Sequence, residues 1–174
     1  MNIRKILIVI GQLVLLVIVG YWFGRDYFEP YAPKKERVGV SLKQTDGSIF
    51  KRGQVWSYKT RPGEEDSRLT VFRTDNSPKF GVIVSVYVEG LKMKDPQKPD
   101  EIVTEIHQMA FSESALKNSV VKMDGMASLL PSDANYQEWA SAYDLGLGGI
   151  IWTSVAEAVD HVETTLSTGK SKWE

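Results

Sequence analysis

Few residues in this sequence have the types and spacing that catalysis requires. Glu105 and His107 lie two residues apart, so on a strand they would share one face and could form a general-base pair or two metal ligands. No further ligand stands at a useful spacing, so the sequence favours a structural role for this pair. We expect the other histidine, His161, to be a solvated residue on a helix.

The densest group of carboxylates is Glu64, Glu65 and Asp66, directly after Arg61-Pro62-Gly63. Two carboxylates on either side of a sugar can hydrolyse a glycosidic bond, so a carboxylate-based hydrolase stays open as an alternative. Pro and Gly at the centre of Arg61-Pro62-Gly63-Glu64 predict a type II turn. Acidic residues are common in turns, so the group needs no catalytic explanation.

The composition excludes several other kinds of site. The 174 residues include no cysteine, which excludes disulfides, thiolate zinc sites, iron–sulfur clusters and a cysteine nucleophile. Two histidines are too few for a multi-histidine metal site. Gly146-Leu-Gly148-Gly149 lacks the spacing of a dinucleotide fingerprint, and no P-loop or G-x-S-x-G motif occurs. The sequence lacks the stripe of basic residues with interleaved aromatic residues that is typical of nucleic-acid binding. We therefore expect no catalytic residue, cofactor or metal.

The N-terminal residues 1–24 predict a transmembrane signal anchor. Ile6 to Gly24 are 19 uncharged residues, long enough as a helix to span roughly 28 Å of bilayer. A cleaved secretory signal is the alternative, but no small-residue cleavage site follows the apolar run. Residues typical of a membrane interface close the run: Tyr21, Trp22, Phe23 and Arg25.

The charges beside this segment predict its orientation. Arg4 and Lys5 favour a cytoplasmic N-terminus, although Arg25 and the basic residues from Lys34 to Arg37 count against it. We expect a single-pass protein of a bacterial inner membrane with its soluble domain in the periplasm. Residues 25–37, with two prolines and alternating charges, predict a juxtamembrane linker.

Residues 38–174 predict a soluble α+β domain. Its first half contains strand-like runs at 54–60, 68–74 and 80–91, and 101–109 could form one more. Short turns separate these runs, so we expect an antiparallel meander of three to five strands.

The second half of the domain predicts about three helices packed on one face of the sheet. Ser112 is a candidate N-cap for a first helix, with Leu116, Val120 and Met123 on one stripe. A second helix is predicted to begin at residues 131–133 and to end at Gly146. A capping box formed by Ser154 to Glu157 starts a third.

Charge is unevenly divided along the chain. Residues 25–100 hold 15 Lys/Arg and 11 Asp/Glu, a net charge of +4, whereas residues 101–174 hold 4 and 11, a net charge of −7. The acidic half is either an ordinary solvated surface or a surface that docks a basic partner. The residues predicted to contact a partner are the turn Arg61, Glu64, Glu65 and Asp66, or the helical acids Glu138, Asp144, Glu157 and Asp160.

One stretch of the domain resembles a known group of proteins. Gly53-Gln-Val-Trp56-Ser-Tyr58-Lys-Thr-Arg61-Pro62-Gly63-Glu64, followed by Ser67-Arg-Leu-Thr-Val71, is similar to small bacterial envelope proteins of unassigned function. The likeness covers roughly residues 50–165. Members of this group carry a cleavable signal or an N-terminal anchor, so the resemblance implies an extracytoplasmic domain. It implies no activity, ligand or catalytic residue.

These observations predict a non-enzymatic binding protein tethered to the membrane. The most concrete form is an immunity or inhibitor protein that neutralises a toxin or hydrolase acting in the envelope. The alternative is an accessory or structural subunit of an inner-membrane complex, and the carboxylate-based hydrolase is a second alternative. Apart from the bilayer around Ile6 to Gly24, we expect a protein partner and no nucleic acid.

Overall fold

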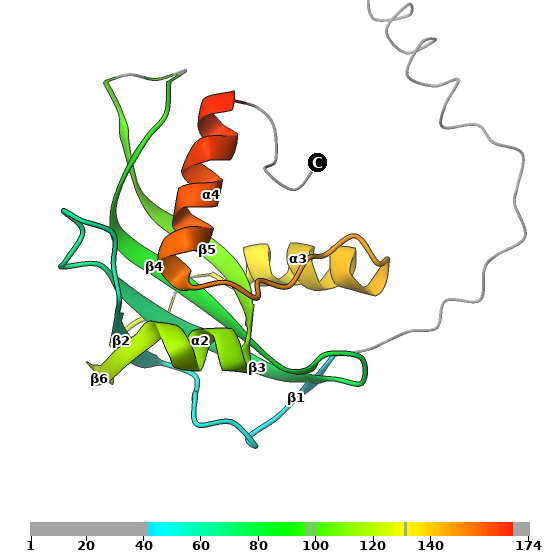
Figure 1. Ribbon diagram of the computed structural model, residues 1–174. Coiled ribbons are helices and arrows are strands. Elements are labelled where there is room, and N and C mark those ends of the chain that lie inside the picture. The colour runs from blue at the N-terminus through cyan, green and yellow to red at the C-terminus, as the bar shows by residue number, and fades with distance from the viewer. Residues whose placement is uncertain (1–41, 97, 99, 131, 169–174) are drawn as a thin grey trace, which may run out of the picture. The chain divides into compact units, whose positions relative to one another are not determined.

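The computed structural model describes residues 42–96, 98, 100–130 and 132–168. An antiparallel sheet and three helices make up this part of the chain, which confirms the α+β class (Figure 1). Within it no helix is both long and apolar enough to cross a bilayer. The predicted anchor at Ile6 to Gly24 and the linker at 25–37 lie outside the described residues.

The sheet has six strands in the order β5-β4-β3-β2-β6, and β1 pairs with β3 beside this path. Strands β2, β3 and β4 each pair with the next strand along the chain, which confirms the predicted antiparallel meander. Their bounds are β1 Lys43–Gln44, β2 Gln54–Tyr58, β3 Arg68–Ser77, β4 Gly81–Lys94, β5 Ile102–Ser112 and β6 Val120–Met126.

The turn between β2 and β3 has the predicted conformation. The Glu64 N–H donates to the Arg61 carbonyl at 3.1 Å, and Gly63 has φ +85°. That left-handed φ at the third position is what a type II turn requires and what glycine adopts without steric cost.

Strand β6 corrects the prediction for the segment after Ser112. The N-cap is confirmed, because Ser112 Oγ accepts a hydrogen bond from the Ala115 N–H. Helix α2 spans only Glu113–Ser119, and the predicted continuation through Val120 and Met123 is wrong. Those two residues pair with β2 instead. Pairing with a distant strand therefore outweighs a helical pattern that consisted of only three apolar residues.

The other two helices form where the sequence places them. Helix α3 spans Ala134–Asp144, and helix α4 spans Val155–Thr168. The capping box of α4 is confirmed, because Glu157 accepts from the Ser154 N–H at 2.9 Å and Ser154 Oγ accepts in return from the Glu157 N–H.

The helices cover both faces of the sheet, so the expectation of one covered face is wrong for α3. Ile83 and Val84 are neighbours on β4 and therefore point to opposite faces. Val84 belongs to the main core with Leu116 of α2 and Val159 of α4. Ile83 belongs to a separate core with Tyr143 of α3.

Aromatic hydroxyl groups explain why α3 occupies its own face. Tyr136 donates to the buried carboxylate of Asp75 at 2.8 Å, and Tyr143 shares a hydrogen bond with buried Ser77. Both partners lie on β3, so α3 supplies hydrogen-bond partners to buried polar groups of the sheet.

We predict that Ser119→Ala destabilises the fold. Ser119 is fully buried, and its Oγ donates to the Ala115 carbonyl and accepts from the Val155 N–H at the start of α4. Alanine leaves that N–H without its partner, which costs about 1–3 kcal/mol of unfolding free energy. Denaturant titration of the full chain measures this, with exposed Ser141→Ala as the matched control. An equal loss in both variants would contradict the assignment.

Candidate functional site

One guanidinium gathers three carboxylates beside the middle of α4. Arg61 donates to Glu64 at 2.8 Å and to Asp160 at 3.0 Å, and it also pairs with Glu163. Glu64 is 3% exposed, so the group reaches from the surface into the interior. We call these four residues the Arg61 cluster.

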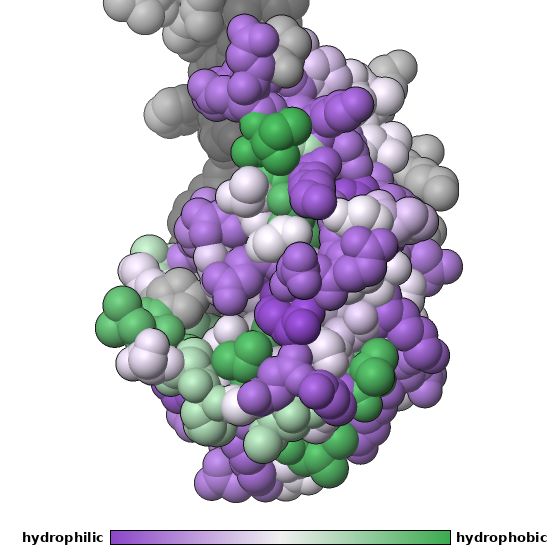
Figure 2. Space-filling view, turned by 90° about the vertical axis from the view of Figure 1, so that its left-hand side faces the viewer, coloured by the Kyte–Doolittle hydropathy of each residue, from purple (hydrophilic) through white to green (hydrophobic). Residues whose placement is uncertain are grey.

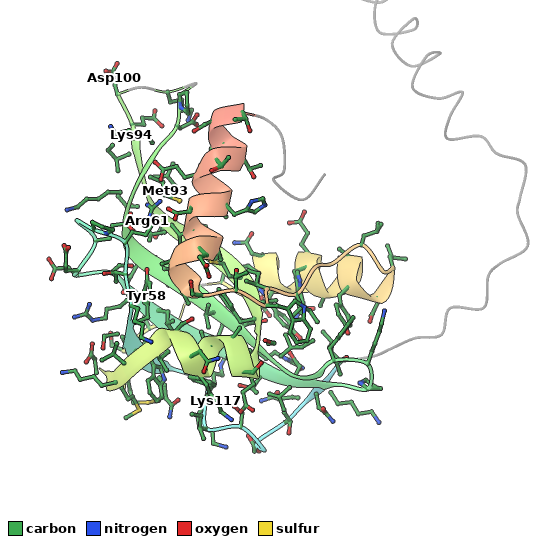
Figure 3. The ribbon with its side chains drawn as sticks, viewed as in Figure 1. Tyr58, Arg61, Met93, Lys94, Asp100 and Lys117 are labelled. Carbon is green, nitrogen blue, oxygen red and sulfur yellow. The ribbon has the colours of Figure 1, made fainter. Side chains whose placement is uncertain are left out.

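The backbone of β4 completes the Arg61 cluster. The Lys92 N–H donates to Glu64 at 2.6 Å, and the Lys94 N–H donates to Glu163 at 2.8 Å. Figure 3 shows Arg61 and Lys94 beside α4, on elements far apart in sequence. The cluster therefore joins the β2–β3 turn, the end of β4 and the middle of α4.

The electrostatics of the Arg61 cluster favour ionised carboxylates. Burial alone would raise the pKa of Glu64, but hydrogen bonds from Arg61 and from the Lys92 N–H outweigh it and lower the pKa. For Glu163 burial is likewise outweighed by the Lys94 N–H and Arg61, which lower the pKa. The hydrogen bond to Glu64 is the main reason that the pKa of Arg61 is raised. A general acid needs the opposite shift, so these carboxylates are suited to holding structure.

The structure divides each of the two sets of residues that the sequence predicted as alternative contact surfaces. Arg61, Glu64 and Asp160 come together, whereas Glu65 and Asp66 lie exposed on the turn. Glu157 caps α4, while the two remaining acids, Glu138 and Asp144, lie on α3 across the sheet. The acids of the second half therefore form no single acidic face. The sequence prediction also omitted Glu163, which is 102 residues from Arg61, and no local pattern could have indicated that contact.

The pair Glu105 and His107 lies on the exposed surface of β5. His107 Nε2 is 3.3 Å from Glu105, and the Tyr87 hydroxyl also donates to Glu105. Burial, together with that hydrogen bond, raises the pKa of Tyr87. Among the described residues no group of three His, Asp or Glu side chains could hold a metal ion.

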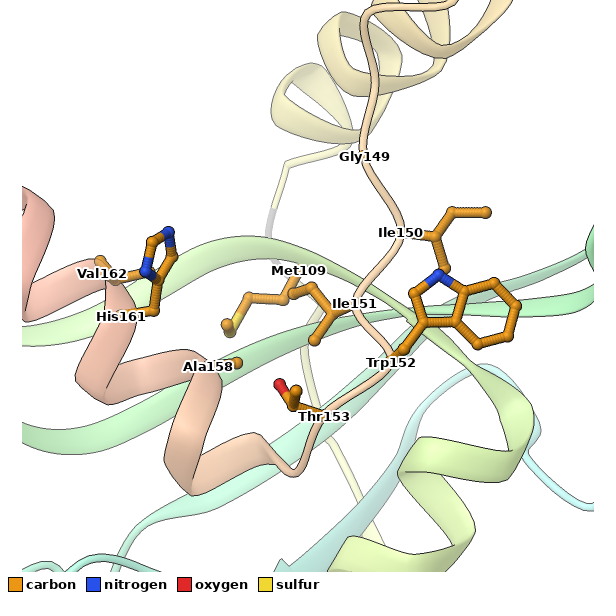
Figure 4. A pocket seen from close by; sticks show the side chains of 9 residues that line it. All are labelled: Met109, Gly149, Ile150, Ile151, Trp152, Thr153, Ala158, His161 and Val162. Carbon is orange, nitrogen blue, oxygen red and sulfur yellow. The ribbon is translucent and has the colours of Figure 1, made fainter. Parts of the chain in front are cut away.

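A second feature is an apolar hollow of about 500 Å³ between α4 and the edge of the sheet (Figure 4). Met109 of β5 lines its floor, and Ala158, His161 and Val162 of α4 line one side. The segment 149–153 lines the other side. No strand or helix that the structure describes fills this space, so it can receive a side chain from another molecule.

Trp152 stands at the hollow with 57% of its surface exposed. Its ring rests on Phe80, with 6.0 Å between the ring centroids. Elsewhere the surface differs: Figure 2 shows a face where hydrophobic side chains form small separate patches among hydrophilic ones. An exposed tryptophan beside an apolar hollow is the more distinctive surface for binding.

Comparison with known proteins gives no match, whether to protein-family models, to curated proteins or to solved structures. The resemblance of Gly53 to Glu64 to bacterial envelope proteins therefore stays a prediction, and the candidate site rests on its own geometry.

We predict that Arg61→Met lowers stability most at neutral pH. A carboxyl with a lowered pKa stabilises the folded state above its unfolded pKa of about 4.3, and the contribution disappears as pH falls through the folded value. Without Arg61 the buried carboxylate of Glu64 loses its charged partner and keeps only the Lys92 N–H, at a cost of about 3 kcal/mol near pH 7. Denaturant titration of the full chain between neutral and acidic pH measures the difference from wild type, which should shrink below about pH 4. A difference independent of pH would contradict this account.

Proposed function

We propose that this chain is a membrane-anchored binding protein that faces the periplasm of a bacterium. Its most concrete role is that of an immunity or inhibitor protein, which neutralises a toxin or hydrolase acting in the envelope. The 19-residue apolar run and the basic residues before it support the single-pass anchor in the inner membrane. The anchor would hold the domain where such a partner arrives.

The observation that carries the proposal is the apolar hollow with Trp152 beside it. A well-packed interface centres on a few aromatic or apolar contacts in desolvated pockets, surrounded by polar residues. Here the hollow and the half-exposed ring supply that centre.

Charge beside the hollow favours a basic partner. Helix α4 carries Glu157, Asp160 and Glu163 and no Lys or Arg between Val155 and Thr168. Arg61 compensates Asp160 and Glu163 on one flank of the helix, while Glu157 lies one turn before His161 on the flank of the hollow. A cationic partner surface would therefore approach this flank faster and in a preferred orientation.

Inhibition would proceed by occlusion. A stable interface buries about 1,200–2,000 Å² in total, which is enough to cover the active site of a small enzyme. The carboxylates of the Arg61 cluster support binding over hydrolysis, because their lone pairs already accept hydrogen bonds from Arg61 and from β4 amides.

We predict that Trp152→Ala weakens partner binding by about thirtyfold, or about 2 kcal/mol, because it removes an aromatic contact at the interface centre. The partner is obtained by crosslinking and capture on the full chain, and its toxic or hydrolytic activity is titrated with wild-type and variant protein. The matched control is Leu129→Ala, which removes another exposed apolar side chain that does not line the hollow. Equal inhibition by wild type and Trp152→Ala, or capture of no such enzyme, would contradict the proposal.

A further inference from the structure

We propose that the partner inserts an extended segment alongside β5, with one bulky apolar side chain in the hollow and a Lys or Arg beside Glu105. This inference rests on the proposed function, since it names the kind of partner segment that the domain recognises. Recognition would then combine backbone hydrogen bonds along a sheet edge with a pocket for one side chain.

The edge position beside β5 is already used at one end. Ile151 pairs with Phe111 in parallel orientation: its N–H donates to the Ala110 carbonyl at 2.8 Å, and the Ser112 N–H donates to the Ile151 carbonyl at 2.9 Å. From Ile102 to Met109, β5 has a strand neighbour only on the β4 side within the described part of the chain. An added segment would continue the row of hydrogen bonds that Ile151 begins.

The hollow lies where such a segment would place its side chains. Met109 pairs with Val86 of β4, so it points to the face that α4 covers, and it forms the floor of the hollow. Successive side chains of a strand alternate between the two faces of the sheet. Alternate residues of the added segment would therefore face α4, and one of them would enter the space beside Ala158 and Val162.

The other side chains of the segment would meet negative charge. Val88 pairs with Ile106, and both contribute to the main core on the face that α4 covers. Glu89 and Glu105 are the next pair along the two strands, so Glu105 lies on the face opposite the hollow. Its side chain is 44% exposed. Glu105 is the one carboxylate of β5, which carries no Lys or Arg, so charge complementarity favours a basic residue opposite it. The expected pattern is an apolar residue flanked by Lys or Arg.

Selection from a displayed random heptapeptide library tests this pattern. The library is selected on the full chain in lipid nanodiscs, with empty nanodiscs to remove peptides that bind lipid. We expect enriched peptides with one Leu, Ile, Phe or Met between basic residues. Replacing that apolar residue by Ser should weaken binding at least about tenfold. Methylation of the peptide amides along one edge should abolish binding, whereas methylation along the other edge should not.

Protein variants locate the binding position. Ala158→Phe fills the hollow, and Glu105→Lys reverses the charge on the opposite face. Each substitution should weaken the binding of the enriched peptides at least about tenfold. Asp66→Lys makes the same charge change on the exposed β2–β3 turn and serves as the matched control. Because the Ser-substituted peptide is measured on wild-type protein, the test holds even where Ala158→Phe fails to fold.

Three results would overturn the inference: no enriched peptide, binding unaffected by both Ala158→Phe and Glu105→Lys, or a larger loss from Asp66→Lys. A captured enzyme that the wild type and both variants inhibit equally would leave the proposed function in place and overturn strand addition alone. Failure to capture any enzyme, with peptides that still bind β5, would overturn the proposed function and leave strand addition in place.

Discussion

The guanidinium of Arg61 attaches α4 to the sheet, and the shape of the candidate site depends on that attachment. It joins a turn between two strands to Asp160 and Glu163 on the helix, while β4 amides donate to Glu163 and to Glu64 of the turn. Charge-assisted hydrogen bonds of this kind are short and directional. They hold one flank of α4 against β4, and the other flank stands apart from β5 and leaves the hollow.

A hollow held open in this way is already organised for binding. Association costs free energy when loops and side chains must become ordered, and a pre-formed pocket reduces that cost. Val155 and Val159 of α4 are fully buried, so the helix is held by the apolar core as well as by the Arg61 cluster. The domain would therefore meet a partner with little rearrangement, as the proposed inhibitor role requires.

Local signals in the sequence were enough for much of the fold. Pro62 and Gly63 specified the turn, and Ser154 with Glu157 specified the start of α4, because each involves residues within one turn of the chain. The site was not predictable in the same way. Strand β6, the face chosen by α3, the contact of Arg61 with α4 and the hollow all depend on pairing between distant segments, which no short pattern encodes.

Amide hydrogen exchange of the full chain, alone and with its captured partner, tests the central claim most directly. The account predicts that partner binding slows exchange at amides along the open edge of β5, between Ile102 and Met109, and around Trp152. Slower exchange confined to the β2–β3 turn or to β6, with no change along β5, would contradict it.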